Sequence, residues 1–442
     1  MSGATRRYTA FGRNAHLPGH WADYSVAAAR VCAARAPRAS CSWAKCDVYD
    51  SCMFQRTIQA RIAASKRSVL LLGARQVGKS TLARALGPDL VINFADEAVF
   101  MTYAKDPGRL GRELRAMGRA SLVLVDEVQR IPSLLNTVQA LMDEGIRHRF
   151  ILTGSSARKL RRGGANLLPG RIVLEYLDPL SVWELGATFD LDVALRTGSL
   201  PGIVSDPEDA AAILETYATV YLREEVQAEA LVREVGAYAR FLDVAAEQSG
   251  AWVNYSKLAS DMEIPKETVR RFFGILEDTL LAFRIEPFRP RAKRRVSQRD
   301  RFVLFDVGVR NALLGLHRQA PVGTDRGVLF EQWIILQCLY FNRSRRLPWR
   351  VSAYRTDAGA EVDIVVDTGR ELLALECKLG HKVRVQDLGG LRSFKEVAHK
   401  PVRALVLYQG ERREQLAEGI TAVPFLEFLR DDLPAMADEG ER

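Results

Sequence analysis

A glycine-rich stretch combines residue types and a spacing that can bind a triphosphate. It follows an apolar run at residues 68–72 and leads into a helical pattern at residues 81–86. The stretch reads Gly73-Ala74-Arg75-Gln76-Val77-Gly78-Lys79-Ser80, and Thr81 follows it. Its glycines let backbone N–H groups and a helix N-terminus point at phosphate oxygens, and Lys79 can reach the β- and γ-phosphates. The spacing predicts a P-loop in which Ser80 also ligates Mg²⁺.

Two acidic residues, Asp126 and Glu127, end an apolar run at residues 121–125. Continuous hydrophobicity indicates a strand covered on both faces, as in a parallel sheet. This is the Walker B pattern, in which Asp126 holds Mg²⁺ directly or through water and Glu127 orients the attacking water. Both acids could instead cap a helix, because Pro132 starts one soon after. The P-loop upstream favours the catalytic interpretation.

Polar residues near two further predicted strands could complete an ATPase site. Thr153, at the end of a strand predicted over residues 149–155, is the first candidate to sense the γ-phosphate, and Ser155 is the second. A simple strand-ending turn is the alternative. Arg171 precedes a strand predicted over residues 172–177 and could bring positive charge to the transferring phosphoryl group, in its own subunit or in a neighbouring one. A solvated arginine fits Arg171 equally well.

The composition is that of a globular protein with a basic excess. The chain has 442 residues, of which 48% are hydrophobic and 26% charged, and a formal net charge of +9. This charge favours polyanionic partners, DNA above all. No apolar run approaches the roughly 20 residues of a membrane span, so we expect no membrane association. No Asn-Lys-x-Asp tetrad is present, which disfavours a GTPase.

The cysteine pattern gives little support to a metal site. Four of the six cysteines crowd the N-terminal region, but they contain no C-x-x-C pair and no histidine at ligand spacing, which disfavours zinc. The other two, Cys338 and Cys377, stand in apolar runs and are expected to be buried thiols. We therefore expect a reduced, cytoplasmic protein.

A second group of chemically capable residues lies far along the chain. Two strands are predicted at residues 361–366 and 371–378, and Glu376 and Lys378 leave the same face of the second. Asp363 on the first strand can join them, and Glu331 can approach from an apolar helix predicted over residues 327–341. Such carboxylates can hold Mg²⁺ at a scissile phosphate while a lysine positions or deprotonates water. A salt bridge on an exposed strand is the alternative.

A helix-turn-helix is predicted between the two candidate sites. Helices are expected at residues 254–262 and from Lys266, with a strand at residues 280–285, which together make the module winged-helix-like. Lys266, Arg270 and Arg271 could meet phosphates. Packing or protein interaction is an equally weighted alternative, because Glu263 and Glu267 dilute the positive face.

The motifs at residues 73–80, 123–129, 151–156 and 168–171, with Leu-Asp-Pro-Leu-Ser-Val-Trp-Glu-Leu at 177–185, resemble a branch of prokaryotic AAA-type ATPases. Members of that branch carry a C-terminal domain of unknown function with a restriction-endonuclease-like core. Asp363 and Glu376-Cys377-Lys378 similarly resemble the PD-(D/E)XK nuclease motif. The resemblance covers about residues 53 to 430 and implies that the protein could assemble into homo-oligomeric rings. A nuclease fold kept only as a scaffold is also open.

These observations predict a multidomain α/β protein. It comprises a basic, disordered extension (1–52), a doubly wound P-loop ATPase domain (53–185), a helical lid or linker (186–232), a winged-helix-like module (233–290), an endonuclease-like α/β domain (291–430) and a frayed acidic tail (431–442). The expected function is ATP hydrolysis coupled to a nuclease-like domain acting on DNA. The alternative is a nucleotide-dependent switch whose C-terminal half binds protein or nucleic acid without cutting it.

Overall fold

The computed structural model describes residues 54–156, 170–222, 235–289, 299–384, 388–417 and 419–441. The predicted extension at residues 1–52 lies outside the described residues, and so does the basic run expected from Arg289 to Arg295, apart from Arg289 itself. Residues 54–442 form one unit, to which all the elements below belong.

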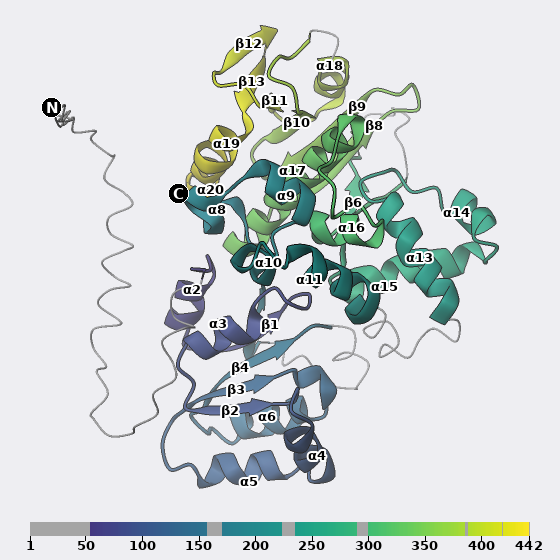
Figure 1. Ribbon diagram of the computed structural model, residues 1–442. Coiled ribbons are helices and arrows are strands. Elements are labelled where there is room, and N and C mark those ends of the chain that lie inside the picture. The colour runs from purple at the N-terminus through teal and green to yellow at the C-terminus, as the bar shows by residue number, and fades with distance from the viewer. Residues whose placement is uncertain are drawn as a thin grey trace, which may run out of the picture. The chain divides into compact units, whose positions relative to one another are not determined.

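A five-stranded parallel sheet forms the first half of this unit, in the order β2-β3-β4-β1-β5 (Figure 1). The strands are β1 (Ser68–Leu72), β2 (Leu90–Asn93), β3 (Leu122–Asp126), β4 (Arg149–Gly154) and β5 (Ile172–Tyr176). Every residue of β1 is buried. The parallel sheet predicted from continuous apolar runs is therefore confirmed.

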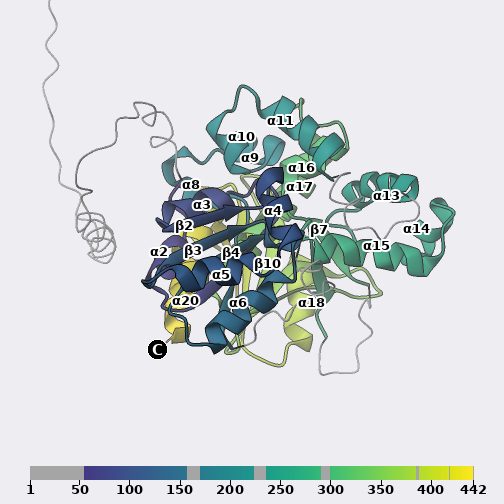
Figure 2. The same cartoon turned by 90° about the horizontal axis from the view of Figure 1, so that it is seen from below.

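Alternate residues of β1 pack on opposite faces of the sheet. Leu70 and Leu72 join the cluster beneath α5 (Arg109–Ala116) and α6 (Leu134–Asp143). Val69 and Leu71 face the other way, toward α2 (Gln59–Ala64) and α3 (Lys79–Ala85). Helix α4 (Glu97–Lys105) follows β2, and Figure 2 shows α4, α5 and α6 beside the strands.

The second face of the sheet shares its hydrophobic core with the downstream helices. After α8 (Val182–Leu185) come α9 (Leu191–Thr197), α10 (Pro201–Ser205), α11 (Ala210–Thr216) and the π-helical segment η4 (Tyr217–Tyr221). Leu195, Leu200 and Tyr217 are all at most 1% exposed and belong to the same cluster as Val69. Residues 186–222 are therefore packed helices that cover the P-loop sheet.

Three helices and an antiparallel strand pair come next. They are α13 (Val235–Glu247), α14 (Tyr255–Asp261), α15 (Lys266–Asp278), β6 (Ala282–Pro287) and β7 (Arg301–Leu304). This order is the one that a winged helix would have, and the assignment stays a prediction. On α15, Arg270 pairs with Glu267 at 2.9 Å and lies over the ring of Tyr255.

The C-terminal half is built on an eight-stranded mixed sheet, in the order β12-β13-β11-β10-β9-β8-β6-β7. Its further strands are β8 (Arg350–Arg355), β9 (Glu361–Asp367), β10 (Leu372–Lys378), β11 (Val402–Tyr408), β12 (Glu414–Ala417) and β13 (Ile420–Pro424). Because β6 pairs with β8, the predicted modules on either side of residue 290 share this sheet.

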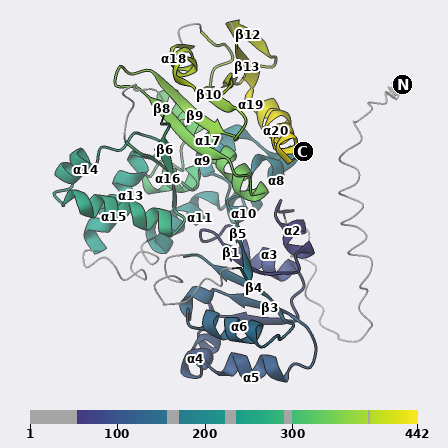
Figure 3. The ribbon, with the colours of Figure 1, turned by 180° about the vertical axis from the view of Figure 1, so that it is seen from behind.

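The helices of this half are α16 (Val307–Leu313), α17 (Gly323–Arg345), α18 (Gly389–Val397), α19 (Phe425–Glu427) and α20 (Leu433–Glu441). Figure 3 shows α17 beside β9 and β10. The 23-residue α17 begins four residues before the predicted start and has little amphipathic character, because it is buried on several sides. No described helix is long and apolar enough to cross a membrane.

The expectation of a frayed tail from residue 431 is wrong for the described residues up to 441. Residues 433–441 form α20, and its Leu433, Met436 and Ala437 are 7% exposed or less. They pack into the large shared core. The sequence did not predict this helix, because its composition is acidic and only three of its apolar side chains are buried.

Candidate functional site

The predicted P-loop turns sharply between β1 and α3. Gly78 has φ of 93° and Gln76 has φ of 63°, both in the left-handed region that L-residues with side chains rarely occupy. At Gly73 a Cβ atom would lie 2.3 Å from the backbone oxygen of Leu177, so only glycine fits where β5 ends against the loop. The two glycines of the motif are thus required by backbone geometry and close approach.

Lys79 folds back over this loop. Its side chain is 5% exposed, and Nζ donates to the backbone oxygens of Gly73 at 2.9 Å and Ala74 at 2.8 Å. The ammonium group therefore lies against two backbone carbonyls at the mouth of the loop.

The Walker B carboxylate meets two hydroxyl groups. Ser80 Oγ donates to Asp126 Oδ1 at 3.0 Å, and Thr153 Oγ1 donates to the same oxygen. The register of β3 with β4 pairs Val125 with Leu152, which brings Asp126 and Thr153 side by side. A buried carboxylate beside serine and threonine hydroxyls is an oxygen-donor set that suits Mg²⁺. Ser80 and Asp126 are the residues that would hold the ion.

Glu127 adopts an unusual backbone conformation, with φ of 58° and ψ of 43°. Its backbone N–H donates to Thr153 Oγ1 at 3.1 Å, and its carboxylate accepts from Gln129. Gln129 also donates to Ser155 Oγ at 3.1 Å. Left-handed backbone at a residue with a side chain costs free energy, and such outliers cluster at functional sites. Glu127, Thr153 and Ser155 are thus joined around the predicted γ-phosphate region.

Arg171 lies at the opposite end of the sheet from the P-loop. Strand β5 begins beside Ser68, the first residue of β1, whereas the P-loop follows the last. Five residues of strand correspond to about 16 Å. Arg171 pairs with Asp143 at the end of α6 instead. A role for Arg171 in its own subunit is therefore ruled out by this geometry, and the role in a neighbouring subunit stays a prediction.

Sequence reasoning missed two residues that contact the loop. Arg56 is 7% exposed and donates to the backbone oxygens of Val77 at 2.7 Å and Asp178 at 2.6 Å, while it pairs with Glu184 at 3.1 Å. Tyr217 donates through its hydroxyl to the backbone oxygen of Arg75 at 3.3 Å. A pairing of Arg56 with the glutamate of the Ser-Val-Trp-Glu segment could not be found without the fold.

The C-terminal carboxylates also come together. The antiparallel register pairs Leu375 of β10 with Ile364 of β9, so the next pair is Glu376 and Asp363. Asp363 Oδ2 accepts from the backbone N–H of Cys377 at 2.8 Å, and Lys378 Nζ donates to Glu376 Oε1 at 2.7 Å. Helix α17 brings Glu331, whose charge acts on both Asp363 and Glu376. We call Glu331, Asp363, Glu376 and Lys378 the carboxylate cluster.

A buried arginine that the sequence did not single out completes this cluster. Arg301, the first residue of β7, is 2% exposed and pairs with Glu331. It also donates to the backbone oxygens of Asp363 at 3.0 Å and Gly250 at 2.7 Å. The one signal in the sequence for a buried Arg301 is its place at the start of an apolar strand. This signal is ambiguous, because an exposed arginine at the start of a strand has the same pattern.

Burial governs protonation in the cluster. It raises the pKa of Asp363 well above its usual value, and the neighbouring Glu331 and Glu376 charges raise it further. Burial likewise raises the pKa of Glu376 to about 7, against the lowering effect of Lys378. The cluster thus retains protons that isolated carboxyl groups would release.

The cluster, as arranged, does not fit a divalent metal ion. Glu331 is engaged by Arg301, one oxygen of Glu376 by Lys378 and one of Asp363 by a backbone N–H, which leaves Glu376 Oε2 as a buried oxygen with no hydrogen-bond partner. Among the described residues, no three or more His, Cys, Asp or Glu side chains are grouped so that they could hold a metal ion.

Helix α17 connects the cluster to the P-loop domain. Toward its C-terminal end, Arg343 pairs with the buried Asp178 at 3.0 Å, and burial raises the pKa of that carboxyl. Arg346 pairs at 2.7 Å with Glu175 of β5, which also pairs with Arg61 of α2 at 2.8 Å. Midway, Gln337 accepts from the backbone N–H of Val182 at 2.8 Å. These ion pairs and this hydrogen bond hold α17 against β5, the strand beside β1.

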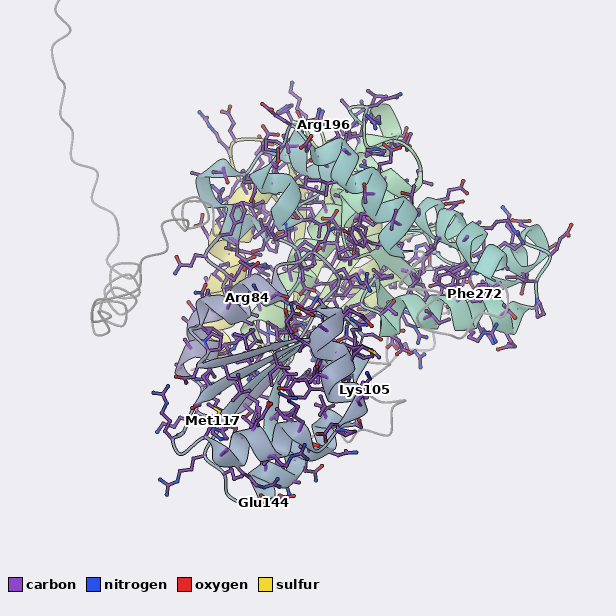
Figure 4. The ribbon with its side chains drawn as sticks, turned by 60° about the horizontal axis from the view of Figure 1, so that its bottom comes forward. Arg84, Lys105, Met117, Glu144, Arg196 and Phe272 are labelled. Atoms are coloured by element: carbon purple, nitrogen blue, oxygen red, sulfur yellow. The ribbon has the colours of Figure 1, made fainter. Side chains whose placement is uncertain are left out.

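The side chains of these elements fill the space between the sheet and the helices, as Figure 4 shows with Arg84 of α3 and Phe272 of α15 labelled. Phe272 is fully buried and contacts Tyr238 and Phe241 of α13 edge-on or tilted. The aromatic packing explains why α13 and α15 stay together beside the sheet.

Three family models match successive parts of the chain. Residues 65–186 match an AAA domain, residues 188–320 match a domain of unknown function, DUF8612, and residues 326–428 match another, DUF4143. The two latter families carry no stated activity. The first match covers β1 to β5 and the P-loop and Walker B residues.

Three uncharacterized proteins are similar in sequence to parts of this chain. Uncharacterized proteins of Mycobacterium tuberculosis and Mycobacterium bovis are each 27% identical over 370 residues, which is 80% of this chain and 79% of theirs. An uncharacterized protein of Methanocaldococcus jannaschii is 28% identical over 217 residues, 47% of this chain and 43% of its own.

Two solved structures overlap with the chain at low scores. A signal transduction ATPase with numerous domains from Pyrococcus horikoshii has a TM-score of 0.22 at 13% identity, over 67% of this chain and 47% of that one. Protein VC1899 of Vibrio cholerae has a TM-score of 0.21 at 10% identity, over 85% and 98%. Both scores are too low to support a structural conclusion. The AAA match and the loop geometry together identify residues 65–186 as an AAA-type P-loop ATPase domain.

Proposed function

We propose that the protein binds and hydrolyses Mg²⁺–ATP, and that the state of the nucleotide is transmitted to the C-terminal half, which acts as a switch toward a protein or nucleic-acid partner. In the ATPase step, residues 73–81 cradle the phosphates, Lys79 neutralises phosphate charge, and Ser80 and Asp126 hold the ion. Glu127 positions the attacking water, and Thr153 responds to the γ-phosphate. The contacts of Asp126 with both hydroxyl residues support this assignment.

The observation that carries the switch is the course of α17. Glu331 near one end belongs to the carboxylate cluster, and Arg343 near the other end pairs with Asp178, whose backbone oxygen accepts from Arg56. Arg56 in turn donates to the P-loop oxygen of Val77. Twelve residues of helix span about 18 Å. A change in the P-loop can therefore move α17 as a rigid element.

The basic excess of the chain favours DNA as the partner, and the C-terminal half would engage it without cutting it. Assembly of several copies is part of the proposal, because Arg171 is 38% exposed and could reach the nucleotide of a neighbouring subunit. This part is tested by measuring the ATP turnover of wild type and Arg171→Ala at increasing protein concentration.

Metal-dependent DNA cleavage is the second candidate function. One observation favours it: Asp363, Glu376 and Lys378, which resemble a nuclease motif, do come together on adjacent strands. The contacts that already engage Glu331, Asp363 Oδ2 and Glu376 Oε1 weigh against it.

One set of reactions separates the two candidates. Wild type and Lys378→Ala are incubated with linear and supercoiled DNA, Mg²⁺ or Mn²⁺, and with or without ATP, while ATP turnover is recorded. The switch predicts ATP turnover by both proteins and intact DNA in every tube. Cleavage by wild type that Lys378→Ala lacks would replace the switch with the nuclease.

Hydrogen exchange tests the transmission itself. We expect a non-hydrolysable ATP analogue to change the exchange of α17 and β10 in wild type and to change it much less in Arg343→Ala. Arg345→Ala is the matched control, because Arg345 contacts Asp438 at 3.6 Å and the ring of Phe341 on its own helix, and neither contact reaches the P-loop domain. Equal responses in the two variants would contradict the assigned route through Arg343.

A further inference from the structure

Arg301 is bound on several sides in the interior beside the carboxylate cluster. Its guanidinium pairs with Glu331 of α17 and donates to the backbone oxygens of Asp363 on β9 and Gly250. It also lies 5.6 Å from the ring centroid of Trp252, close enough for a cation–π contact. Three separate parts of the chain therefore hold this one side chain: α17, β9 and the segment that contains Gly250 and Trp252.

The surroundings of Arg301 are shaped for it. Gly250 has φ of 80°, which turns its carbonyl toward Arg301, and a Cβ at that position would lie 2.8 Å from Gln332 Cγ. Gln332 follows Glu331 on α17 and accepts from Ser249 at 2.8 Å. The loop after α13 and the part of α17 around Glu331 are thus packed closely around the arginine and its partner.

An arginine supplies positive charge that neither leaves nor titrates. The guanidinium keeps its proton at every physiological pH and presents five donors in a fixed planar fork. A divalent ion, in contrast, exchanges with solvent and needs several free carboxylate or water oxygens around it. In this cluster Glu331 is turned to the fork of Arg301, and Glu376 to the ammonium of Lys378.

We propose that Arg301 is the resident cation of the carboxylate cluster and that its pairing with Glu331 keeps divalent metal ions from binding among these carboxylates. The cluster then works as a fixed ionic joint among α17, β7, β9 and β10. This inference does not depend on transmission from the ATPase domain. It requires only that the three carboxylates be balanced by side-chain cations and retained protons.

Removal of the guanidinium should convert the joint into a metal site. Arg301→Met keeps an unbranched apolar chain but leaves Glu331, Asp363 and Glu376 near one another without their main cation. Arg301→Lys keeps one positive charge. We expect Arg301→Met to bind one Mn²⁺, Arg301→Lys to bind at least tenfold more weakly, and Arg301→Met/Asp363→Asn to bind none at this site.

Electron paramagnetic resonance of free Mn²⁺, titrated into nucleotide-free full-length protein, measures this binding. Basal ATP turnover of each variant is the check on folding. If Arg301→Met does not turn over ATP, Arg301→Gln replaces it with the same expected result.

Two results would overturn the inference. Wild type that binds Mn²⁺ without nucleotide, and loses it in Asp363→Asn, would show that Arg301 does not exclude metal. A folded Arg301 variant that binds no Mn²⁺ would show that something other than Arg301 excludes it. A failure of transmission through Arg343 changes neither measurement, so the two proposals fail separately.

Discussion

The ATPase site and the carboxylate cluster each contain a lysine and a buried carboxylate, yet the carboxylates have different partners. Lys79 rests on two neutral carbonyls, and Asp126 accepts from two hydroxyls. In the cluster, Lys378 is paired with Glu376, and Arg301 with Glu331. The printed contacts of the Asp126 carboxylate are thus with neutral hydroxyls, whereas Glu376 and Glu331 of the cluster are paired with cations.

The difference bears on what each site can receive. Neutral hydrogen bonds exchange readily for an incoming phosphate and its metal ion, because no charge is left unpaired when they break. A buried ion pair resists exchange, since removal of one member leaves an uncompensated charge. The same residue types therefore indicate a ligand site in one half of the chain and a structural joint in the other.

The largest expected effect separates the two lysines. Lys79→Ala should lower ATP turnover by about 10³-fold, because the phosphates lose their principal positive charge. Lys378→Ala should leave turnover within about twofold of wild type. Steady-state phosphate release measures both, and equal losses in the two variants would remove the distinction between the sites.

Asp306 extends the comparison to a buried carboxyl that is met by backbone N–H groups. It accepts from Ser199 at 2.8 Å and Val309 at 3.0 Å, and burial raises its pKa to about 6. Because the folded-state pKa lies above the unfolded value of 3.8, the contribution of Asp306 to stability is largest below about pH 4 and is lost as pH rises through 6. The contribution is roughly 3 kcal/mol by the usual conversion.

Urea unfolding of wild type and Asp306→Asn at several pH values between 4 and 8 measures this contribution. Between pH 4 and 6 wild type should lose more stability than the variant, by up to roughly 3 kcal/mol. A wild-type curve that rises through that range more steeply than the curve of the variant would contradict the prediction.

Glu127→Gln should lower turnover by about 10²-fold while ATP binding stays intact, because an amide positions water but does not polarise it. Gln129→Ala tests the same residue indirectly, since Gln129 donates to the Glu127 carboxylate. Single-turnover hydrolysis with a separate nucleotide-binding titration distinguishes a loss of chemistry from a loss of affinity. Loss of binding in Glu127→Gln would mean that Glu127 holds the nucleotide instead.

The smallest expected effect concerns the clamp between α17 and β5. Glu175 is 3% exposed and pairs with Arg61 and Arg346, which are both partly exposed. Glu175→Gln should cost about 2 kcal/mol of unfolding free energy, less than the roughly 3–5 kcal/mol of a fully buried pair, because both arginines are partly exposed. Glu144→Gln, which breaks a surface pair with Arg115, is the control and should leave the urea midpoint unchanged.

Much of the P-loop domain could be predicted from the sequence because its signals are local. The strands at residues 68–72 and 122–126 read as continuous apolar runs, and the loop between strand and helix is fixed by glycines whose geometry the structure requires. In the parallel sheet β3 and β4 are neighbours and end at the same edge, which brings Thr153 beside Asp126.

Contacts over long sequence distances could not be predicted in this way. Arg56 reaches Glu184 across 128 residues, and Arg301 reaches Asp363 across 62. Nothing in the local pattern distinguishes these arginines from exposed ones. The interpretation of Arg171 in its own subunit failed for another reason: a residue that precedes a strand of a parallel sheet lies at the edge opposite the P-loop, which follows a strand.

Counting bound Mn²⁺ per chain, with and without an ATP analogue, tests the contrast between the two sites most directly. Wild type, Lys79→Ala and Asp363→Asn are compared by electron paramagnetic resonance. We predict one Mn²⁺ that requires the nucleotide, that is lost in Lys79→Ala and that persists in Asp363→Asn, with none bound in the absence of nucleotide. A nucleotide-independent Mn²⁺ that persists in Lys79→Ala and disappears in Asp363→Asn would contradict this contrast and favour a metal-dependent nuclease.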